Sequence, residues 1–249
     1  MKLSEITEWI DGELEVGKFD DVSNNSLQIS RRGDAISRVA FGVDASVDFI
    51  AKAASAGAEL CVVHHGISWG GGIKRITGGV YEVIKTAMDA NVALYAVHLP
   101  LDANEKWGNN WEIARHLELK DIAKAFSYHG NIIGVTGKAS KDGVYRIGEA
   151  EIFLSAGEKV GVCSGGAGDF AEEAKNLGCS LFITGEASWA DVIAAENVGM
   201  RMIQAGHYET ETFGIKALQR AMAESIGAET FFIPILPARE LRRRPQNLV

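Results

Sequence analysis

The sequence of 249 residues contains few cysteines and no long hydrophobic run. Its three cysteines, Cys61, Cys163 and Cys179, are too few for a disulfide framework, and each lies in or beside an apolar run. We interpret them as small buried residues in a reducing compartment. No run approaches the roughly 20 apolar residues of a membrane-spanning helix, and the N-terminus lacks the hydrophobic core of a signal peptide. These absences favour a cytoplasmic protein that makes no membrane contact.

Basic residues are also in the minority. Lysine and arginine number 25 against 33 aspartates and glutamates, which gives a net charge of −8. A general nucleic-acid-binding surface needs a basic face, so nucleic acid is a doubtful partner. We interpret the basic run at residues 239–244 as a solvated tail rather than a binding arm.

Helical and strand-like patterns alternate along the chain. Helical periodicity covers residues 3–14, 46–56, 81–90, 111–117 and 207–226. Apolar strand-like runs cover residues 27–29, 37–43, 61–63, 92–97, 132–135, 200–203 and 230–235. This alternation predicts an α/β fold with parallel-dominated sheets covered by helices on both faces. Pro234 can donate no ladder hydrogen bond, which places the last strand at a sheet edge.

An internal repeat relates the two halves of the chain. Residues 39–65 align with residues 160–186 without a gap, at a constant offset of 121. Asp48-Phe49, Gly57 and Leu60 recur as Asp169-Phe170, Gly178 and Leu181. We therefore predict two similar three-layer α/β units that arose by internal duplication. The expected domains are residues 1–125, completed by 207–249, and residues 126–206.

Imidazole and carboxylate side chains follow three of the strand-like runs. His64 and His65 end the first, His98 and Asp102 follow the second, and His207 and Glu211 follow the third. Groups at the carboxyl ends of strands in open α/β sheets face ligands. Adjacent residues on a strand point to opposite sides, so the histidine pair favours two ions, or one ion and a supporting ring. On a helix, residues at i and i+4 share one face, which suits the last pair to one ion or to neighbouring ions.

Together with Gly108-Asn109-Asn110 and Thr184-Gly185-Glu186, these motifs resemble the family of GTP cyclohydrolase 1 type 2 homologues. These are dinuclear-metal, hexameric proteins related to the NGG-interacting factor. The likeness covers nearly the whole chain in the same order. It implies two divalent metal ions per subunit, held in the cleft between the units by His64, His65, Asp102, His207 and Glu211. Zinc, iron and manganese all accept this mixture of ligands.

The sequence departs from the family at Ser26, in the run Asn25-Ser26-Leu27-Gln28, where relatives more often carry glycine. Serine adopts a positive φ at a higher cost than glycine, so this turn is expected to differ locally. The five ligand positions show no departure.

The chemistry implied by this resemblance is hydrolysis. Two ions about 3.5–4 Å apart lower the pKa of a bridging water and supply hydroxide at neutral pH. Our first hypothesis is a metal-dependent hydrolase that acts on a nucleotide-like small molecule, with Lys74 and Arg75 as a candidate phosphate contact or a solvated pair. The alternative is a non-catalytic, metal-binding, hexameric assembly protein. The resemblance implies a homohexamer, a trimer of dimers, and Trp69, Trp107 and Trp189 are candidate interface residues or caps on the core.

Two further residues are candidate catalytic groups. Glu186 is the repeat equivalent of His65, so it is expected to face the same cleft as an acid/base or substrate contact, or else to form a helix cap or salt bridge. His98 lies four residues before Asp102 at the same strand end and is a candidate supporting residue, or else a buried core histidine. The glycines at residues 70–72 form a flap or a plain connection. The glycine-rich run at 163–169 is interpreted as a tight turn, because it lacks the Lys-Ser/Thr of a phosphate-binding loop.

Overall fold

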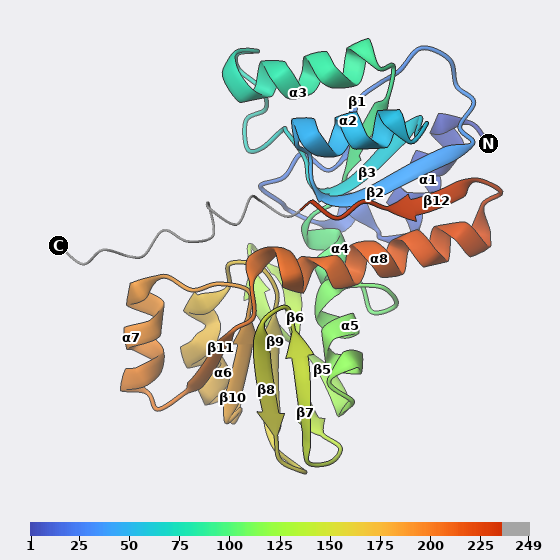
Figure 1. The fold of residues 1–249 in the computed structure, drawn as a ribbon. Helices are drawn as coiled ribbons and strands as arrows, with labels where there is room; N and C mark the ends of the chain where they lie inside the picture. The colour runs from blue at the N-terminus through green and yellow to red at the C-terminus, as the bar shows by residue number, and fades with distance from the viewer. Residues whose placement is uncertain (236–249) are drawn as a thin grey trace.

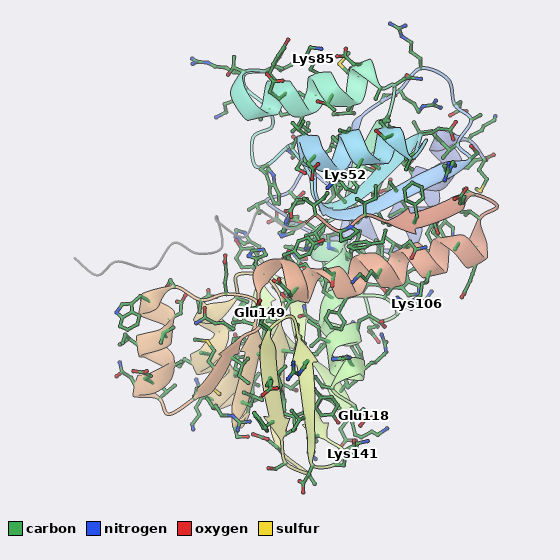
Figure 2. All side chains as sticks on the ribbon, viewed as in Figure 1. Lys52, Lys85, Lys106, Glu118, Lys141 and Glu149 are labelled. Carbon is green, nitrogen blue, oxygen red and sulfur yellow. The ribbon has the colours of Figure 1, made fainter. Side chains whose placement is uncertain are left out.

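The computed structural model describes residues 1–235, so the basic run at 239–244 lies outside the described residues. Two α/β units lie one above the other, and the long helix α8, His207–Ser225, crosses between them (Figure 1). Charged side chains surround both units. Lys52 and Lys85 lie on the outer helices of one unit, and the ion pair between Lys141 and Glu118 lies at the far end of the other (Figure 2). No helix among the described residues is long and apolar enough to cross a membrane.

The first sheet has the strand order β1-β4-β3-β2-β12. Its strands are β1 Ser26–Ile29, β2 Arg38–Asp44, β3 Leu60–His65, β4 Ala93–Ala96 and β12 Glu229–Phe232. All pair in parallel except β1, which is antiparallel to β4. The last strand occupies the edge, as predicted, but it ends at Phe232 and so is shorter than the predicted run of residues 230–235.

Helices cover both faces of this sheet. On β2, Val39 and Phe41 pack against α1 Leu3–Glu13 and α8, whereas Ala40 packs against α2 Val47–Ser55 and α3 Gly78–Asp89. Side chains alternate across a strand, so a run that is apolar at every position needs cover on both sides. The first unit is therefore three layers thick.

The second sheet has the order β11-β10-β9-β6-β5. Its strands are β5 Leu119–Tyr128, β6 Asn131–Ala139, β9 Lys159–Cys163, β10 Leu181–Thr184 and β11 Arg201–Gln204. One face packs against α6 Ala171–Asn176 and α7 Trp189–Asn197. The other packs against α5 Asn109–His116 and a hairpin of β7 Gly143–Ile147 and β8 Ala150–Leu154. This hairpin gives the second unit a third layer that differs from that of the first.

The strand registers support the internal repeat. Val39 of β2 pairs with Leu60 of β3, and Val160 of β9 pairs with Leu181 of β10. The two pairs are related by the offset of 121 residues. In each pair the strands are parallel, and a helix connects them along the chain. His64-His65 at the end of β3 therefore corresponds to Gly185-Glu186 just after β10.

Several elements were not predicted from the sequence. They are β5, the β7–β8 hairpin, the short helix α4 Leu99–Ala103 and the 3₁₀ turns η1 Val16–Lys18 and η2 Gly168–Phe170. Asp102 consequently lies on α4 and not on a strand end. The domain boundaries remain a prediction. Because β5 crosses residue 125 and pairs with β6, we propose that the second domain begins before β5.

The three tryptophans differ in their surroundings. Trp107 is partly buried against Trp9, with ring centroids 5.8 Å apart, and packs on the first core. Trp189 is 74% exposed on α7, and Trp69 is 37% exposed beside the histidines. Trp107 therefore caps a core, whereas Trp69 and Trp189 stay exposed and available for an interface.

Candidate metal centre

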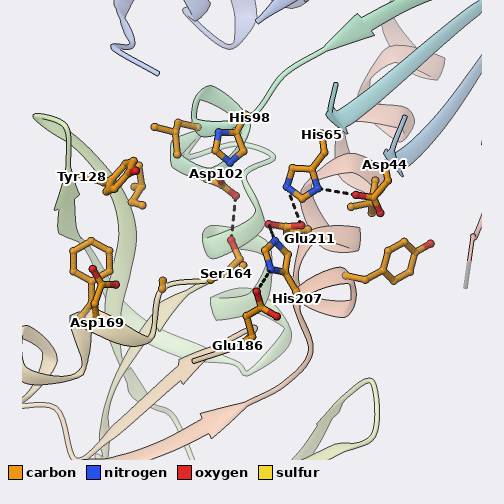
Figure 3. Close-up of a pocket in the computed structure, with 18 of the residues that line it drawn as sticks. Asp44, His65, His98, Asp102, Tyr128, Ser164, Asp169, Glu186, His207 and Glu211 are labelled. Atoms are coloured by element: carbon orange, nitrogen blue, oxygen red, sulfur yellow. Dashed lines mark hydrogen bonds and ion pairs between the residues drawn. The ribbon is translucent and has the colours of Figure 1, made fainter. Parts of the chain in front are cut away.

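The structure brings all five predicted metal ligands together between the two units. Figure 3 labels His65, Asp102, His207 and Glu211 among them. Two come from the end of β3, one from α4 and two from the first turns of α8. Glu211 lies at the centre and is buried. Its Oε1 is 3.5 Å from His64 Nε2 and 3.1 Å from His207 Nε2, and its Oε2 is 3.4 Å from His65 Nε2. Asp102 Oδ2 lies 3.6 Å from His64 Nε2.

The two adjacent histidines do not point to opposite sides of the sheet. Their ring centroids are 4.7 Å apart, and each Nε2 faces a different oxygen of Glu211. The alternation of an extended strand is lost here because His65 is the last residue of β3. One carboxylate thus faces both rings through separate oxygens.

Each histidine ring around the centre is held through its Nδ1 atom. The partners are Val97 O for His64 at 2.9 Å, Asp44 for His65 at 2.8 Å, Asp21 for His98 at 2.9 Å and Glu186 for His207 at 3.0 Å. Carbonyl and carboxylate oxygens accept, so each Nδ1 donates and each Nε2 is directed at the centre as a possible ligand. Histidines that bind metals are oriented in this way.

Two buried atoms at the centre have no hydrogen-bond partner among the described residues. They are His64 Nε2 and Glu211 Oε2. Leaving such atoms unsatisfied costs about 1–3 kcal/mol each, so native proteins rarely do it without a reason. Both are lone-pair donors, and imidazole nitrogen with carboxylate oxygen suits zinc, iron or manganese. The residues present therefore fit a divalent metal ion, and one ring nitrogen from each of His64, His65 and His98 lies within 4.8 Å of the others.

Two hydrogen bonds fix the side chain of Asp102, one from helix α5 and one from the turn after β9. Its Oδ1 accepts hydrogen bonds from Asn109 Nδ2 at 2.8 Å and from Ser164 Oγ at 3.0 Å. Asn110, next along α5, accepts from Ser164 N at 2.7 Å and donates to Ile133 O at 2.8 Å. The Gly108-Asn109-Asn110 motif thus joins the ligand-bearing helix α4 to the second sheet. No sequence pattern indicated this role for Ser164.

Charge and hydrogen bonding shift the pKa values of the cluster. Burial opposes the charged form of Glu211, but the surrounding imidazoles outweigh it and hold its pKa well below the usual range. Burial likewise opposes protonation of His65, yet hydrogen bonds to Asp44 and Glu211 raise its pKa to about 10. The hydrogen bond to Glu211 is the main cause that raises the pKa of His207 to about 9. Carboxylates and imidazoles therefore stabilise one another's charges.

The two candidate catalytic residues lie at the same cavity. Glu186 is exposed at its rim and accepts from His207 Nδ1, so it orients that ring; an acid/base role stays a prediction. His98 is half-buried, with its ring centroid 5.1 Å from His64, so it belongs to the cluster and not to the core. Its role also stays a prediction.

Asp21 is a residue of this site that the sequence did not reveal. Its carboxylate accepts from His98 Nδ1, from the backbone of Ser23 and Leu99, and from Asn25 Nδ2. Burial would raise its pKa, but these hydrogen bonds and the imidazole lower it to about 2. It fixes both His98 and the start of α4. It lies in a polar loop far from the histidines in sequence, so nothing in the local pattern marked it.

A cavity of about 660 Å³ opens beside the cluster. Its lining includes Trp69, Tyr128, Phe170, Glu186 and the glycine-rich turn at 164–167. Gly165 has φ +67°, and a Cβ there would lie 2.6 Å from Glu211 Oε1, so the turn needs glycine to approach the cluster. The described lining contains no lysine or arginine, so Lys74 and Arg75 are not part of it.

Comparison with known proteins agrees with the resemblance drawn from the motifs. Residues 1–238 match the family model described as Duf34/NIF3 (NGG1p interacting factor 3). A Pyrococcus horikoshii protein named "GTP cyclohydrolase 1 type 2 homolog" is 37% identical, with 94% of this chain and 98% of that protein covered. A Deinococcus radiodurans protein of the same name is 39% identical, with 92% and 91% covered. The solved structure of protein ybgI, described as of unknown function, has a TM-score of 0.83 at 27% identity and covers 95% of this chain and 99% of that one. The chain belongs to the Duf34/NIF3 (NGG1p interacting factor 3) family.

Proposed function

We propose that this protein is a metal-dependent hydrolase with a dinuclear centre, acting on a nucleotide-like small molecule. The observation that carries the proposal is the pair of buried, unsatisfied atoms, His64 Nε2 and Glu211 Oε2, at the meeting point of five candidate ligands. The ligands would be His64, His65, Asp102, His207 and Glu211. When bound, a pair of divalent ions lowers the pKa of water and polarises the bond to be hydrolysed.

The protein's own residues prepare the site for that chemistry. Glu211 offers separate oxygens to the two sides of the cluster, so it is the proposed shared ligand. The Trp69 ring packs edge-on against the His98 ring, with ring centroids 5.2 Å apart, at the wall of the cavity. Glu186 holds a proton between its carboxylate and His207 Nδ1 at 3.0 Å and is the proposed acid/base group. Three imidazoles and two carboxylates leave positions open for water and substrate, unlike a closed structural site.

The competing proposal is a non-catalytic, metal-binding, hexameric assembly protein. The exposed cross-strand pair Val144 and Phe153 and the exposed Trp189 give it a surface for association. A homohexamer, built as a trimer of dimers, is compatible with either function, and we keep a cytoplasmic location as a prediction. Light scattering at neutral pH with metal present tests for the homohexamer, and a monomer at micromolar concentration would exclude it.

Metal analysis and turnover separate the two proposals. Protein reconstituted with zinc, iron or manganese should hold two ions per chain, and a ceiling of one ion would exclude the dinuclear centre. The loaded protein is then assayed for hydrolysis of nucleotides and related heterocycles. Glu211→Ala should remove both metal and turnover, whereas His116→Ala, which changes an exposed histidine outside the cluster, should retain both. A loaded, assembled protein that hydrolyses none of these compounds favours the assembly role.

A further inference from the structure

The cavity beside the cluster has a second wall, which lies opposite the candidate ligands. Figure 3 shows Tyr128 and Asp169 on one side of the pocket and His65 and His207 on the other. Tyr128 ends β5, and Phe170 ends the turn η2. Both are partly buried and pack on a core that contains Leu99 and Ile133, which also line the cavity. The metal-binding proposal uses none of these side chains.

This wall combines two aromatic rings with aliphatic side chains. Such surfaces favour flat apolar or aromatic groups, and each stacked ring contributes roughly 1–3 kcal/mol in comparable sites. A flexible, fully hydrated group would gain little there. The residue composition of the wall therefore favours a planar ring.

Asp169 adds a charge to the edge of the same wall. Its carboxylate is exposed and has no hydrogen bond or ion pair with any residue in the described part of the chain. Neither lysine nor arginine occurs in the described lining of the cavity. A phosphate placed at this end would meet an unneutralised carboxylate, whereas an N–H group or a cation would be stabilised by it.

The internal repeat shows that this arrangement is particular to the second unit. The equivalent of Asp169 is Asp48, which forms an ion pair at 2.7 Å with Lys52 four residues later. Four residues after Asp169 the chain carries Glu173, so the carboxylate lacks the corresponding cation. The equivalent of Phe170 is Phe49, which is fully buried in its core, whereas Phe170 lines the cavity. One copy uses the pair for packing, and the other presents it to the cavity.

We propose that this wall binds a planar nitrogen heterocycle, with its face on Tyr128 and Phe170 and an N–H-bearing or cationic edge toward Asp169. The inference rests on the proposed function in that it names the substrate class of the same cavity. It places the reacting bond of the substrate on the ligand side and its nitrogen-rich edge on the far side. Any phosphate of the substrate lies outside this end of the cavity.

Binding of two small probes tests the inference without turnover. The probe 2-aminobenzimidazole is flat and carries a guanidine-like edge, and benzimidazole is the same ring without the amino group. Both are titrated by calorimetry into the full chain, metal-loaded and metal-free. We expect 2-aminobenzimidazole to bind about tenfold more tightly than benzimidazole, since a charge-assisted hydrogen bond has about that effect.

Variants assign the binding to the wall. Asp169→Asn should weaken binding of 2-aminobenzimidazole about tenfold and weaken binding of benzimidazole, which offers a single neutral N–H, by less. Tyr128→Ala should weaken both probes, and Tyr128→Phe should restore them. The control is Glu82→Gln, which removes an exposed carboxylate from the outer helix α3 and should change neither. Metal content and thermal midpoint are measured for each variant, so that a folding defect is recognised.

Equal affinity of 2-aminobenzimidazole for the wild type and Asp169→Asn would overturn the inference, and so would the absence of binding at millimolar probe. These outcomes are distinct from failure of the proposed function. If the protein binds the probes through Asp169 but hydrolyses no compound, the hydrolase proposal is refuted and the heterocycle-binding site is retained. If the protein hydrolyses compounds but Asp169→Asn does not change its affinity for the probes, the hydrolase proposal is retained and the heterocycle-binding site is refuted.

Discussion

Asp102 Oδ1 accepts a hydrogen bond from Ser164 Oγ at 3.0 Å, which joins helix α4 to the end of β9. The two residues are separated by 62 positions, and both are buried. This contact leaves Asp102 Oδ2 to face His64 Nε2. The site is thus assembled across the two units, and its geometry depends on residues that touch no metal.

Ser164→Ala is expected to weaken metal binding by roughly tenfold, because loss of a hydrogen bond to a metal ligand typically costs 10–100-fold in affinity. Competition with a chromogenic chelator measures the change. Ser180→Ala is the control, since its hydroxyl bonds Glu158 at the other end of the second sheet. Unchanged affinity in Ser164→Ala would show that Asn109 alone fixes Asp102.

Gly165→Ala is expected to abolish binding of at least one ion while the fold is kept. The residue has φ +67°, and its new Cβ would lie 2.6 Å from Glu211 Oε1 and 3.4 Å from His207 Nε2. The substitution therefore strains the backbone by about 1–2 kcal/mol and displaces the central carboxylate. Elemental analysis gives the occupancy, and circular dichroism checks the fold. Gly178→Ala, at φ +80° with open space around it, carries the strain without the clash and should keep its metal.

Metal binding is expected to release protons at neutral pH. The pKa values of about 10 for His65 and about 9 for His207 mean that both rings are protonated at pH 7 without metal. A metal ion binds the neutral imidazole, so each ring must lose a proton and the affinity rises as pH rises toward 9–10. Metal is added to a weakly buffered solution with a pH indicator. Loading that releases no proton at pH 7 would show that these rings are neutral beforehand or do not bind.

The sequence marked the candidate ligands as a group because His64, His98 and His207 follow apolar strand-like runs; metal binding by them stays a prediction. The runs before His65, His98 and His207 have recognisable length and composition. Parallel pairing brings the ends of β3 and β4 to one edge of the first sheet, whereas His207 follows β11 of the second sheet and begins α8. The register of Val39 with Leu60 and of Val160 with Leu181 likewise follows from the repeat.

The remainder of the site depends on side chains whose partners are distant in sequence. Asp21 reaches His98 across 77 residues, and Asn109 bonds the backbone of Gly214 across 105. The strand β5 also escaped prediction, because Lys120, Asp121 and Lys124 break any apolar alternation on this edge strand. Such features are set by tertiary contacts and not by local pattern.

Ser26 is expected to be the position at which glycine is more stable than alanine. Ser26 stands where the family resemblance leads us to expect glycine, and its φ is +84°. Its hydroxyl donates to Asp11 Oδ2 at 3.0 Å, which offsets part of the backbone strain. Ser26→Ala loses this bond and keeps the strain, so we expect a loss of about 1 kcal/mol in the free energy of unfolding.

Ser26→Gly also loses the hydrogen bond but relieves the strain, so it should be about 1 kcal/mol more stable than Ser26→Ala. Urea denaturation of both variants measures the difference. The same pair of changes at Ser4, in the helix α1, provides the control, because alanine should be the more stable there. If the alanine variant were also the more stable at residue 26, the turn would not hold its positive φ in solution. Gln28, two residues later, would then lose its fixed position. Its side chain accepts a hydrogen bond from the backbone of Ile67, in the loop after the histidines.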